Sequence, residues 1–197
     1  MALSRTKIAN LAIIRIGEKR VTDITDTTSE SAKLCAEMYE ELRDELLEGG
    51  PEKGWKFAKH RKAVAVDATA PDFGYDYRFQ IPSNPKCLRI VSVQVEGVEL
   101  TDCVREGNYV LTNQEAEEVD MIYIKQVASE ADFPPHFASL FWKTMAARLA
   151  FSRVQSEKLK QTIELEANEE MQKAIAADNM ETLEYHKGSN TLQETGR

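Results

Sequence analysis

The side chains that could do chemistry are few and widely separated in this sequence. Only three residues, His60, His136 and His186, have side chains that ordinarily change charge near neutral pH. No serine or cysteine stands in the GxSxG context of a nucleophile elbow. The glycine-rich stretch Gly49–Gly54 matches neither a Walker motif nor a GxGxxG turn after a strand. The sequence therefore predicts no catalytic residue and no cofactor-binding site.

Carboxylate pairs are the feature that could attract a divalent cation, because Ca²⁺ and Mg²⁺ prefer oxygen ligands. None of these pairs has EF-hand spacing or a histidine beside it, and the three cysteines include no CxxC motif. Surface carboxylates at turns and on a solvated helix face explain the same residues, so we predict no metal site. The pairs are Asp23 with Asp26, Asp72 with Asp76, and Glu169 with Glu170.

The formal net charge of -8 at pH 7 argues against a nucleic-acid-binding or membrane-binding role for the whole surface. An acidic surface suits a conduit along which DNA slides without sticking. Lys59–Lys62 is the best candidate for a local contact with nucleic acid, although a solvated edge explains it as well. No apolar stretch reaches the roughly 20 residues that a membrane-spanning helix needs, so we expect no membrane partner.

Two helices are predicted in the N-terminal quarter. The first covers Arg5–Ile16 and ends at Gly17, which is suited to a left-handed conformation. A capping box formed by Thr27 and Glu30 predicts that the second begins near Thr28. That helix carries a clear apolar stripe until a Gly-Gly-Pro sequence stops it. The predicted stripe of the first helix is Ile8, Leu11, Ala12 and Ile16.

The middle of the chain changes to short runs separated by turn residues, which predicts a small and mostly antiparallel sheet. Glu96-Gly97 and Glu106-Gly107-Asn108 are typical of tight hairpin turns. Aromatic residues alternate from Phe73 to Phe79, and we expect this row to pack against the helices. The predicted strands are 63–66, 75–81, 88–95, 99–100, 109–112 and 119–126.

Helical character returns after Phe133-Pro134-Pro135. The segment Phe137–Phe151 is apolar on nearly every face, which is typical of a central helix or a subunit interface. A more polar helix follows, with a narrow stripe that includes Leu159, Ile163 and Met171. From about Glu184 onward there are too few apolar groups to offset the conformational entropy that is lost when a chain becomes ordered. We therefore expect mobility unless a partner holds this segment.

These elements predict an α+β fold, with an antiparallel helical bundle of N- and C-terminal helices and an inserted small antiparallel β-rich subdomain. Residues 1–56 and 130–180 form the discontinuous bundle, and residues 57–129 form the insertion. Residues 181–197 form a flexible C-terminal tail.

An ordered series of segments resembles the tail tubular protein A family of short-tailed bacteriophages. The match extends to about Ala177 and rests on order, because each motif alone consists mostly of core positions. The stretch Gly49–Gly54 is an enlarged loop relative to the plainer family pattern, so the resemblance does not indicate what this loop contacts. The segments are Ile14-Arg15-Ile16-Gly17, Val21-Thr22-Asp23-Ile24, Ala32-Lys33-Leu34-Cys35 leading to Tyr39 and Arg43-Asp44-Glu45-Leu46-Leu47, Trp55-Lys56-Phe57-Ala58, Tyr75-Asp76-Tyr77-Arg78-Phe79-Gln80-Ile81-Pro82 and Cys87-Leu88-Arg89-Ile90.

The resemblance implies a virion structural protein and not an enzyme. Its copies would form a dodecameric adaptor ring between the portal protein and the tail nozzle or next tail component. Double-stranded DNA would pass through this ring without sequence-specific binding. The protein would be assembled in the host cytoplasm and become part of the virion tail or connector.

Under this reading the apolar stripe of the last helix and part of the preceding helix are candidate contacts with the portal or a neighbouring subunit. Core packing explains the aromatic residues of the preceding helix nearly as well. The candidates are Leu159, Ile163, Met171, Ile175, Leu183, Phe141 and Trp142.

Two alternatives remain open. A head-completion or stopper protein of a long-tailed phage would also offer a helical bundle to a portal. A small nucleic-acid-processing enzyme would use Lys59–Lys62 together with Asp72 or Asp76.

Overall fold

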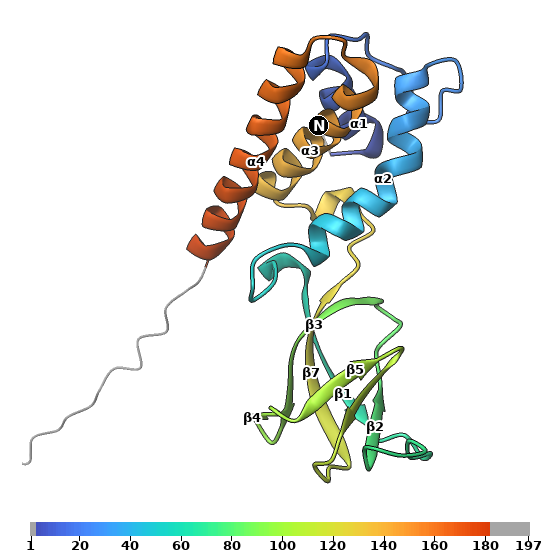
Figure 1. The fold of residues 1–197 in the computed structure, drawn as a ribbon, viewed down its shortest axis with the longest axis vertical. Helices are drawn as coiled ribbons and strands as arrows, with labels where there is room; N and C mark the ends of the chain where they lie inside the picture. Colours follow the sequence, from blue (N-terminus) through green and yellow to red (C-terminus); the bar gives the residue numbers. More distant parts are fainter. Residues whose placement is uncertain (1–2, 182–197) are drawn as a thin grey trace, which may run out of the picture.

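The computed structural model describes residues 3–181, and within them the fold is mixed α+β, with four α-helices and two antiparallel sheets (Figure 1). Short 3-10 helices, η1 (Lys56–Ala58) and η2 (Glu130–Asp132), stand where the chain enters and leaves the strands. The helices gather in one part of the molecule and the strands in another. The α-helices are α1 (Arg5–Arg15), α2 (Glu30–Glu48), α3 (Pro135–Arg153) and α4 (Glu157–Met180).

All strands of the described chain lie between α2 and α3 in sequence. The first sheet has the strand order β1-β7-β3-β4 and the second has the order β2-β6-β5. Every strand pair is antiparallel. Among these strands, only β3 with β4 and β5 with β6 are joined directly by tight turns. The strands are β1 (Lys59–Ala65), β2 (Tyr77–Gln80), β3 (Cys87–Val95), β4 (Val98–Glu99), β5 (Cys103–Glu106), β6 (Tyr109–Thr112) and β7 (Glu118–Lys125).

The second helix starts later than the capping box predicts. Ser29, not Thr27, is its N-cap, and the Ser29 hydroxyl accepts a hydrogen bond from the backbone N–H of Ala32 at 3.3 Å. Thr28 belongs to the preceding turn, because its backbone N–H donates to the Asp26 carboxylate at 2.9 Å. Such a local side-chain bond competes with helix formation, and it delays the start to Glu30.

The turn predictions are confirmed, whereas two strand predictions need correction. Glu96 and Gly97 have φ values of 50° and 80°, as a primed hairpin turn requires, and Gly107 has φ 57° between β5 and β6. The sequence missed β5, whose residues are mostly exposed and show no clear alternation. The first strand was also predicted to begin at residue 63, although the basic run from Lys59 already pairs with β7. Charged residues are common on such an edge strand.

Two apolar clusters fill the interior. One joins the four helices, and the other lies between the strands. Phe79 is fully buried in the second cluster and Tyr77 packs against it, while Phe73 is 88% exposed. The aromatic row therefore does not pack against the helices as expected. Its buried end completes the interior between the two sheets, because β1 and β2 meet at the Val66–Phe79 bridge.

Trp55 is the fully buried residue at which the chain passes from α2 into the strands. Its indole N–H donates to the Leu46 carbonyl at 2.8 Å, so its polar atom is satisfied. Its ring meets Phe137 edge-on, with 5.6 Å between centroids. Gly50 and Gly54 of the glycine-rich loop lie directly against this interior: an added Cβ would come within 2.1 Å of the Trp55 ring or of the Ile124 side chain, respectively.

We expect Gly54→Ala to lower the free energy of unfolding by about 2–3 kcal/mol, because it combines a positive φ with overpacking. Gly54 has φ +73°, and its new methyl group would meet the Ile124 side chain. Gly74 is the matched control, since it has φ +86° and nothing within 4 Å of an added Cβ. Gly74→Ala should cost only about 1 kcal/mol in the same urea titration. Equal losses in the two variants would contradict the close packing of Gly54.

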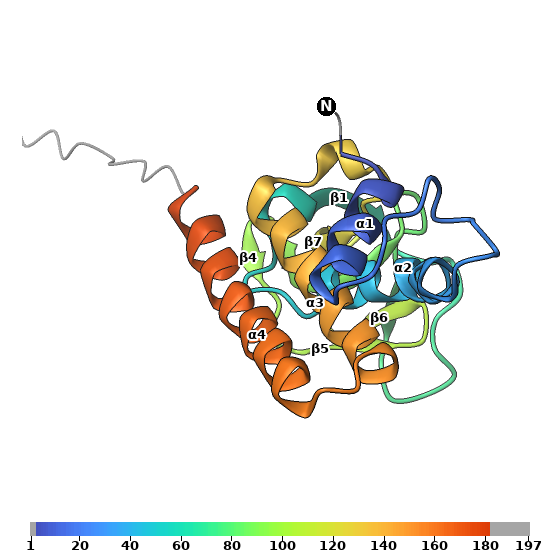
Figure 2. The ribbon, with the colours of Figure 1, turned by 90° about the horizontal axis from the view of Figure 1, so that it is seen from above.

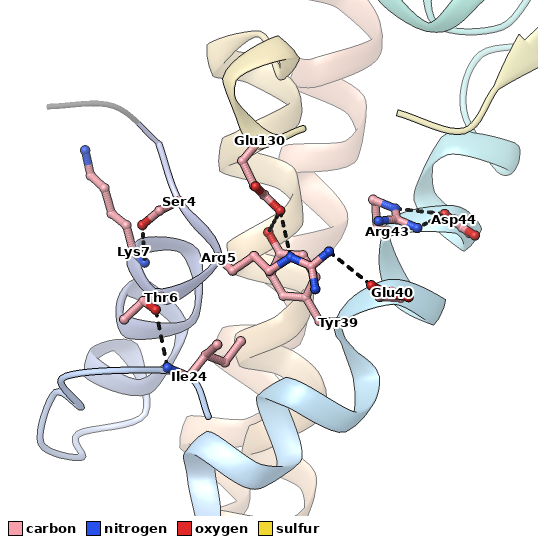
Figure 3. A network of polar contacts seen from close by, with 10 residues as sticks. All are labelled: Ser4, Arg5, Thr6, Lys7, Ile24, Tyr39, Glu40, Arg43, Asp44 and Glu130. Carbon is pink, nitrogen blue, oxygen red and sulfur yellow. Dashed lines mark hydrogen bonds and ion pairs between the residues drawn. The ribbon is translucent and has the colours of Figure 1, made fainter. Parts of the chain in front are cut away.

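A polar network ties the helices together near the start of α1 (Figure 3). Arg5 donates to Glu130 of η2 at 3.2 Å and to Glu40 of α2 at 3.0 Å. The guanidinium also lies 5.2 Å from the centre of the Tyr39 ring, and the Tyr39 hydroxyl donates to Glu130. Burial, and then the Glu130 charge, raise the pKa of Tyr39 far above its ordinary value, so this hydroxyl stays a donor.

Candidate interaction surfaces

Helix α4 lies along α3 (Figure 2). Its apolar stripe belongs to the buried cluster of the helices. Ile163 and Ala174 are each 1% exposed, and Ala167 is also buried. These small and medium side chains, four or seven positions apart, form one face of the helix. The buried part of the stripe therefore already packs within the protomer, although the stripe was proposed from the sequence as a contact with a partner.

The predicted contact residues fall into three groups. Phe141 and Ile163 belong to the core of the protomer, at 0% and 1% exposure, so they are not surface contacts in this structure. Leu183 lies outside the described residues, as does the proposed tail beyond Glu181. The remaining four are half-buried and pack against the same core cluster: Trp142, Leu159, Met171 and Ile175.

Two ion pairs hold the middle of α4. Glu166 accepts both hydrogen bonds of a bidentate pair with Arg15 of α1, at 2.6 and 2.8 Å. Glu170 accepts from the Lys143 ammonium at 2.6 Å. The Arg15 hydrogen bond lowers the pKa of Glu166 below its ordinary value. At Glu170 burial favours a higher pKa. The hydrogen bonds from Lys143 and Ser139, together with the charges of Lys143 and Lys173, outweigh burial, so the pKa of Glu170 is also lowered.

We expect the attachment of α4 to weaken in acid. A lowered carboxylate pKa means that the stabilisation is fully present above the unfolded-state pKa, ordinarily near 4.5, and is lost as the pH falls below it. Arg15→Gln should therefore reduce the loss of unfolding free energy between pH 7 and about pH 3.5. The measurement is urea unfolding at both pH values.

The control for this pH experiment is Lys173→Gln. Lys173 pairs with Glu169 at 3.6 Å on the outer face of α4, and both side chains are about two-thirds exposed. This variant should keep nearly all of the acid sensitivity of the wild type, because such an exposed pair contributes little and the Lys173 charge is the smallest of the influences on the pKa of Glu170. An Arg15→Gln variant that loses stability in acid as steeply as the wild type would rule out the proposed linkage.

The C-terminal end of α4 is fastened by Asp178, which sequence reasoning missed. Its carboxylate is buried and accepts a hydrogen bond from the backbone N–H of Lys56 at 2.9 Å. The Lys56 ammonium lies 3.7 Å from the same carboxylate and also donates to the Asp178 carbonyl. Asp178 stands four residues after Ala174, at the next position of the buried stripe. A carboxylate at an apolar stripe position is the signal that could have identified it.

A groove of about 550 Å³ runs between α2 and α4, with α3 as its floor. Phe151 lines it and is 83% exposed, with the Lys160 ammonium 5.8 Å from its ring centre. An exposed phenylalanine beside further apolar groups is unusual on a free surface. The other apolar lining residues are Leu46, Leu140, Ala147, Ala167 and Met171.

The outer face of α1 is a second exposed apolar surface. Leu11 and Ile14 are 38% and 48% exposed, and they line a shallow hollow together with Lys7 and Arg20. The sequence placed Leu11 in the buried stripe. That prediction is wrong, because the helix buries instead the face that carries Ile8, Ala9, Ala12 and Ile13.

Of the residues proposed for an enzymatic site, His60 and Asp76 lie far apart. His60 lies near the start of β1, with its ring centre 5.4 Å from that of Tyr123. Asp76 precedes β2 and lies beyond the Val66–Phe79 bridge, six residues of extended strand from His60, or roughly 20 Å. Asp72 is exposed in the loop before β2.

Residues 3–181 contain neither a candidate metal site nor a candidate membrane-spanning helix. In this part of the chain no group of three or more His, Cys, Asp and Glu residues is placed to hold a metal ion. None of the described helices has both the length and the apolar character needed to cross a membrane. No protein-family model matches the chain, and no curated protein matches it at a significant level.

Proposed function

We propose that the protein is a virion structural protein of a short-tailed bacteriophage, an adaptor subunit that connects the portal to the tail nozzle or tail tube. The ordered series of segments that resembles the tail tubular protein A family carries this proposal. The proposed partners are the portal protein, the next tail component and further copies of the same chain. The proposed location is the tail or connector of the virion.

Structural roles of individual residues within those segments support the proposal. Gly17 ends α1 with φ +88°, and Tyr39 joins the Arg5 and Glu130 network. Trp55 is the buried residue between α2 and the strands, and Phe79 is fully buried in the apolar cluster between the strands. The resemblance therefore rests on positions where a change would disturb the fold.

The finer architecture we propose is an antiparallel helical bundle of residues 1–56 and 130–180 with residues 57–129 inserted as a β-rich subdomain. Two apolar clusters support this division, one mainly of residues from the helices and the other of residues from the strands and their loops. The Trp55 junction and the η2 segment are the two places where the chain would cross between the parts. In the adaptor, the helical part would face the portal and the β part would face the tail.

The net charge of -8 suits the proposed conduit, because an acidic wall repels the phosphates of passing DNA. Ring formation needs a heterologous contact, in which one surface of a subunit meets a different surface of the next. Both features concern the surface and not a reactive centre, which fits a structural role.

The test is to mix the purified protein with the portal ring encoded by the same genome. Native mass spectrometry counts the bound copies, and electron microscopy of the same sample places them. We expect a saturating, symmetry-matched ring at one end of the portal. A folded protein that fails to bind an intact portal would overturn the proposal. The same ring on the portal of a long-tailed phage would favour a head-completion protein.

Two exposed apolar residues provide matched variants that test which part of the adaptor faces the portal. Leu165 of α4 is 63% exposed and Val98 of the β3–β4 hairpin is 70% exposed. Leu165→Glu should weaken portal binding about tenfold or more, whereas Val98→Glu should leave it unchanged. The opposite pattern would reverse the proposed orientation of the adaptor.

A further inference from the structure

The helices around α3 leave one side open. Helix α1 neighbours α2 through the Arg5–Glu40 pair and neighbours α4 through the Arg15–Glu166 pair. In space, the order of the helices around α3 is thus α2, α1 and α4. The remaining gap, between α4 and α2, is the groove that contains Phe151. Figure 2, which views the molecule from above, shows α1 and α4 beside α3. The groove and the outer face of α1 therefore lie on opposite sides of α3.

The rim of the groove carries acidic charge that the described chain does not neutralise. Its two basic residues are already paired, Arg148 with Glu45 and Lys160 with Glu157. Within residues 3–181, three exposed acidic residues at or next to the groove make no ion pair: Glu41, Glu48 and Glu164. An occupant with an apolar face and basic flanks would complement this surface.

The outer face of α1 combines an apolar face with basic flanks in this way. Leu11 and Ile14 form its apolar part, and Lys7 lies on the same side of the helix, four and seven residues earlier. Arg20 adds a second cation at the edge of the hollow. Neither cation makes an ion pair with any residue between positions 3 and 181. The two surfaces are thus complementary in both charge and polarity.

We propose that the α1 face of one copy of this chain sits in the α2–α3–α4 groove of the next copy. The contact removes Leu11, Ile14 and Phe151 from water and brings Lys7 and Arg20 beside acidic residues of the groove. Because the two surfaces differ and lie on opposite sides of α3, the contact is head-to-tail and can continue into a ring. The closed ring rests on the proposed adaptor function, whereas the pairwise contact does not.

Two double variants test the contact, and every substituted side chain is exposed. The face variant carries Leu11→Ser and Ile14→Ser, so its α1 face loses its apolar part but keeps the cations Lys7 and Arg20, which the groove variant also repels. The groove variant carries Phe151→Lys and Glu164→Lys, so its groove repels the cations of α1. Circular dichroism checks that both variants fold. Val98→Glu, on the β3–β4 hairpin, is the control.

Sedimentation velocity gives the expected results. The wild type and Val98→Glu form oligomers larger than dimers as the concentration rises. Each double variant alone associates at least about tenfold more weakly. A mixture of the two variants forms a dimer and nothing larger, because the intact face of the groove variant fits the intact groove of the face variant and both remaining surfaces are blocked. This capped dimer is specific to a head-to-tail contact.

Three results would overturn the contact. These are oligomers of either double variant that equal those of the wild type, a mixture that stays monomeric, and a wild type that is monomeric at about 1 mM. A groove variant that loses portal binding but keeps self-association would assign the groove to the portal instead. The adaptor proposal is judged separately, because portal binding by the wild type decides it whether or not the capped dimer forms.

Discussion

Replacing Trp55 by alanine lowers the free energy of unfolding by about 3–5 kcal/mol, the range for deleting a large buried aromatic side chain. The ring is fully buried, contacts Phe137, and donates a hydrogen bond to the Leu46 carbonyl. Alanine would leave a cavity where α2, α3 and the glycine-rich loop meet and would also leave that carbonyl without its partner. Urea unfolding followed by far-UV circular dichroism measures the loss.

The second tryptophan provides the control. Trp142 is half-buried at the edge of the helical cluster, with the Lys143 ammonium 5.6 Å from its ring centre. Trp142→Ala should cost about 1–2 kcal/mol, because a partly exposed ring loses less apolar contact. Trp55→Phe separates the two contributions of Trp55, since it retains most of the ring volume but removes the donor. A Trp55→Ala loss no larger than that of Trp142→Ala would contradict the role of Trp55 as the junction.

Replacing Asp178 by alanine lowers the free energy of unfolding by about 3–4 kcal/mol, because it removes the charged partner of Lys56 and leaves a backbone donor unpaired. The lost contacts are the 2.9 Å bond from the Lys56 backbone N–H and the 3.7 Å ion pair with its ammonium. The effect should be concentrated in α4, since this residue holds its C-terminal end. Hydrogen exchange should become faster in residues 170–180 than in the rest of the helices.

The matched control removes an exposed acidic residue from the same helix. Glu169→Ala deletes the partner of Lys173 on the outer face and should change stability by no more than about 0.5 kcal/mol. Asp178→Asn should fall between the two, because an amide oxygen can still accept from the Lys56 backbone while the ion pair is lost. Equal effects of Asp178→Ala and Glu169→Ala would show that the buried contact does not hold α4.

The attachment of α4 also bears on the portal contact. If the buried stripe had to be released for portal binding, Asp178→Ala would strengthen binding by freeing it. We expect the opposite, because Ile163 and Ala174 complete the helical core and the exposed face with Leu165 remains available. Weaker portal binding by Asp178→Ala than by the wild type would support a docked α4 in the assembled adaptor.

Much of the fold could be predicted from the sequence, because helix periods and turn residues act locally. The start of α1 after Ser4, its end at Gly17, and the turns at Gly97 and Gly107 follow from capping and from φ preferences. The start of α2 was predicted too early for the same local reason, since Asp26 competes for the backbone of Thr28. β5 was missed because an exposed strand carries little apolar pattern.

The candidate contacts were less predictable, because a stripe shows that a helix has an apolar face but not what covers it. Ile163 was expected at a partner surface but is buried in the cluster of the helices. Leu11 was expected in the core but is exposed. By itself the sequence determined the order of the helices and of every strand except β5, the turns and the acidic charge. Only the tertiary structure decided which faces are buried, through contacts such as Asp178 with Lys56 that join residues 122 positions apart. Such contacts depend on the packing of distant elements, which no local pattern contains.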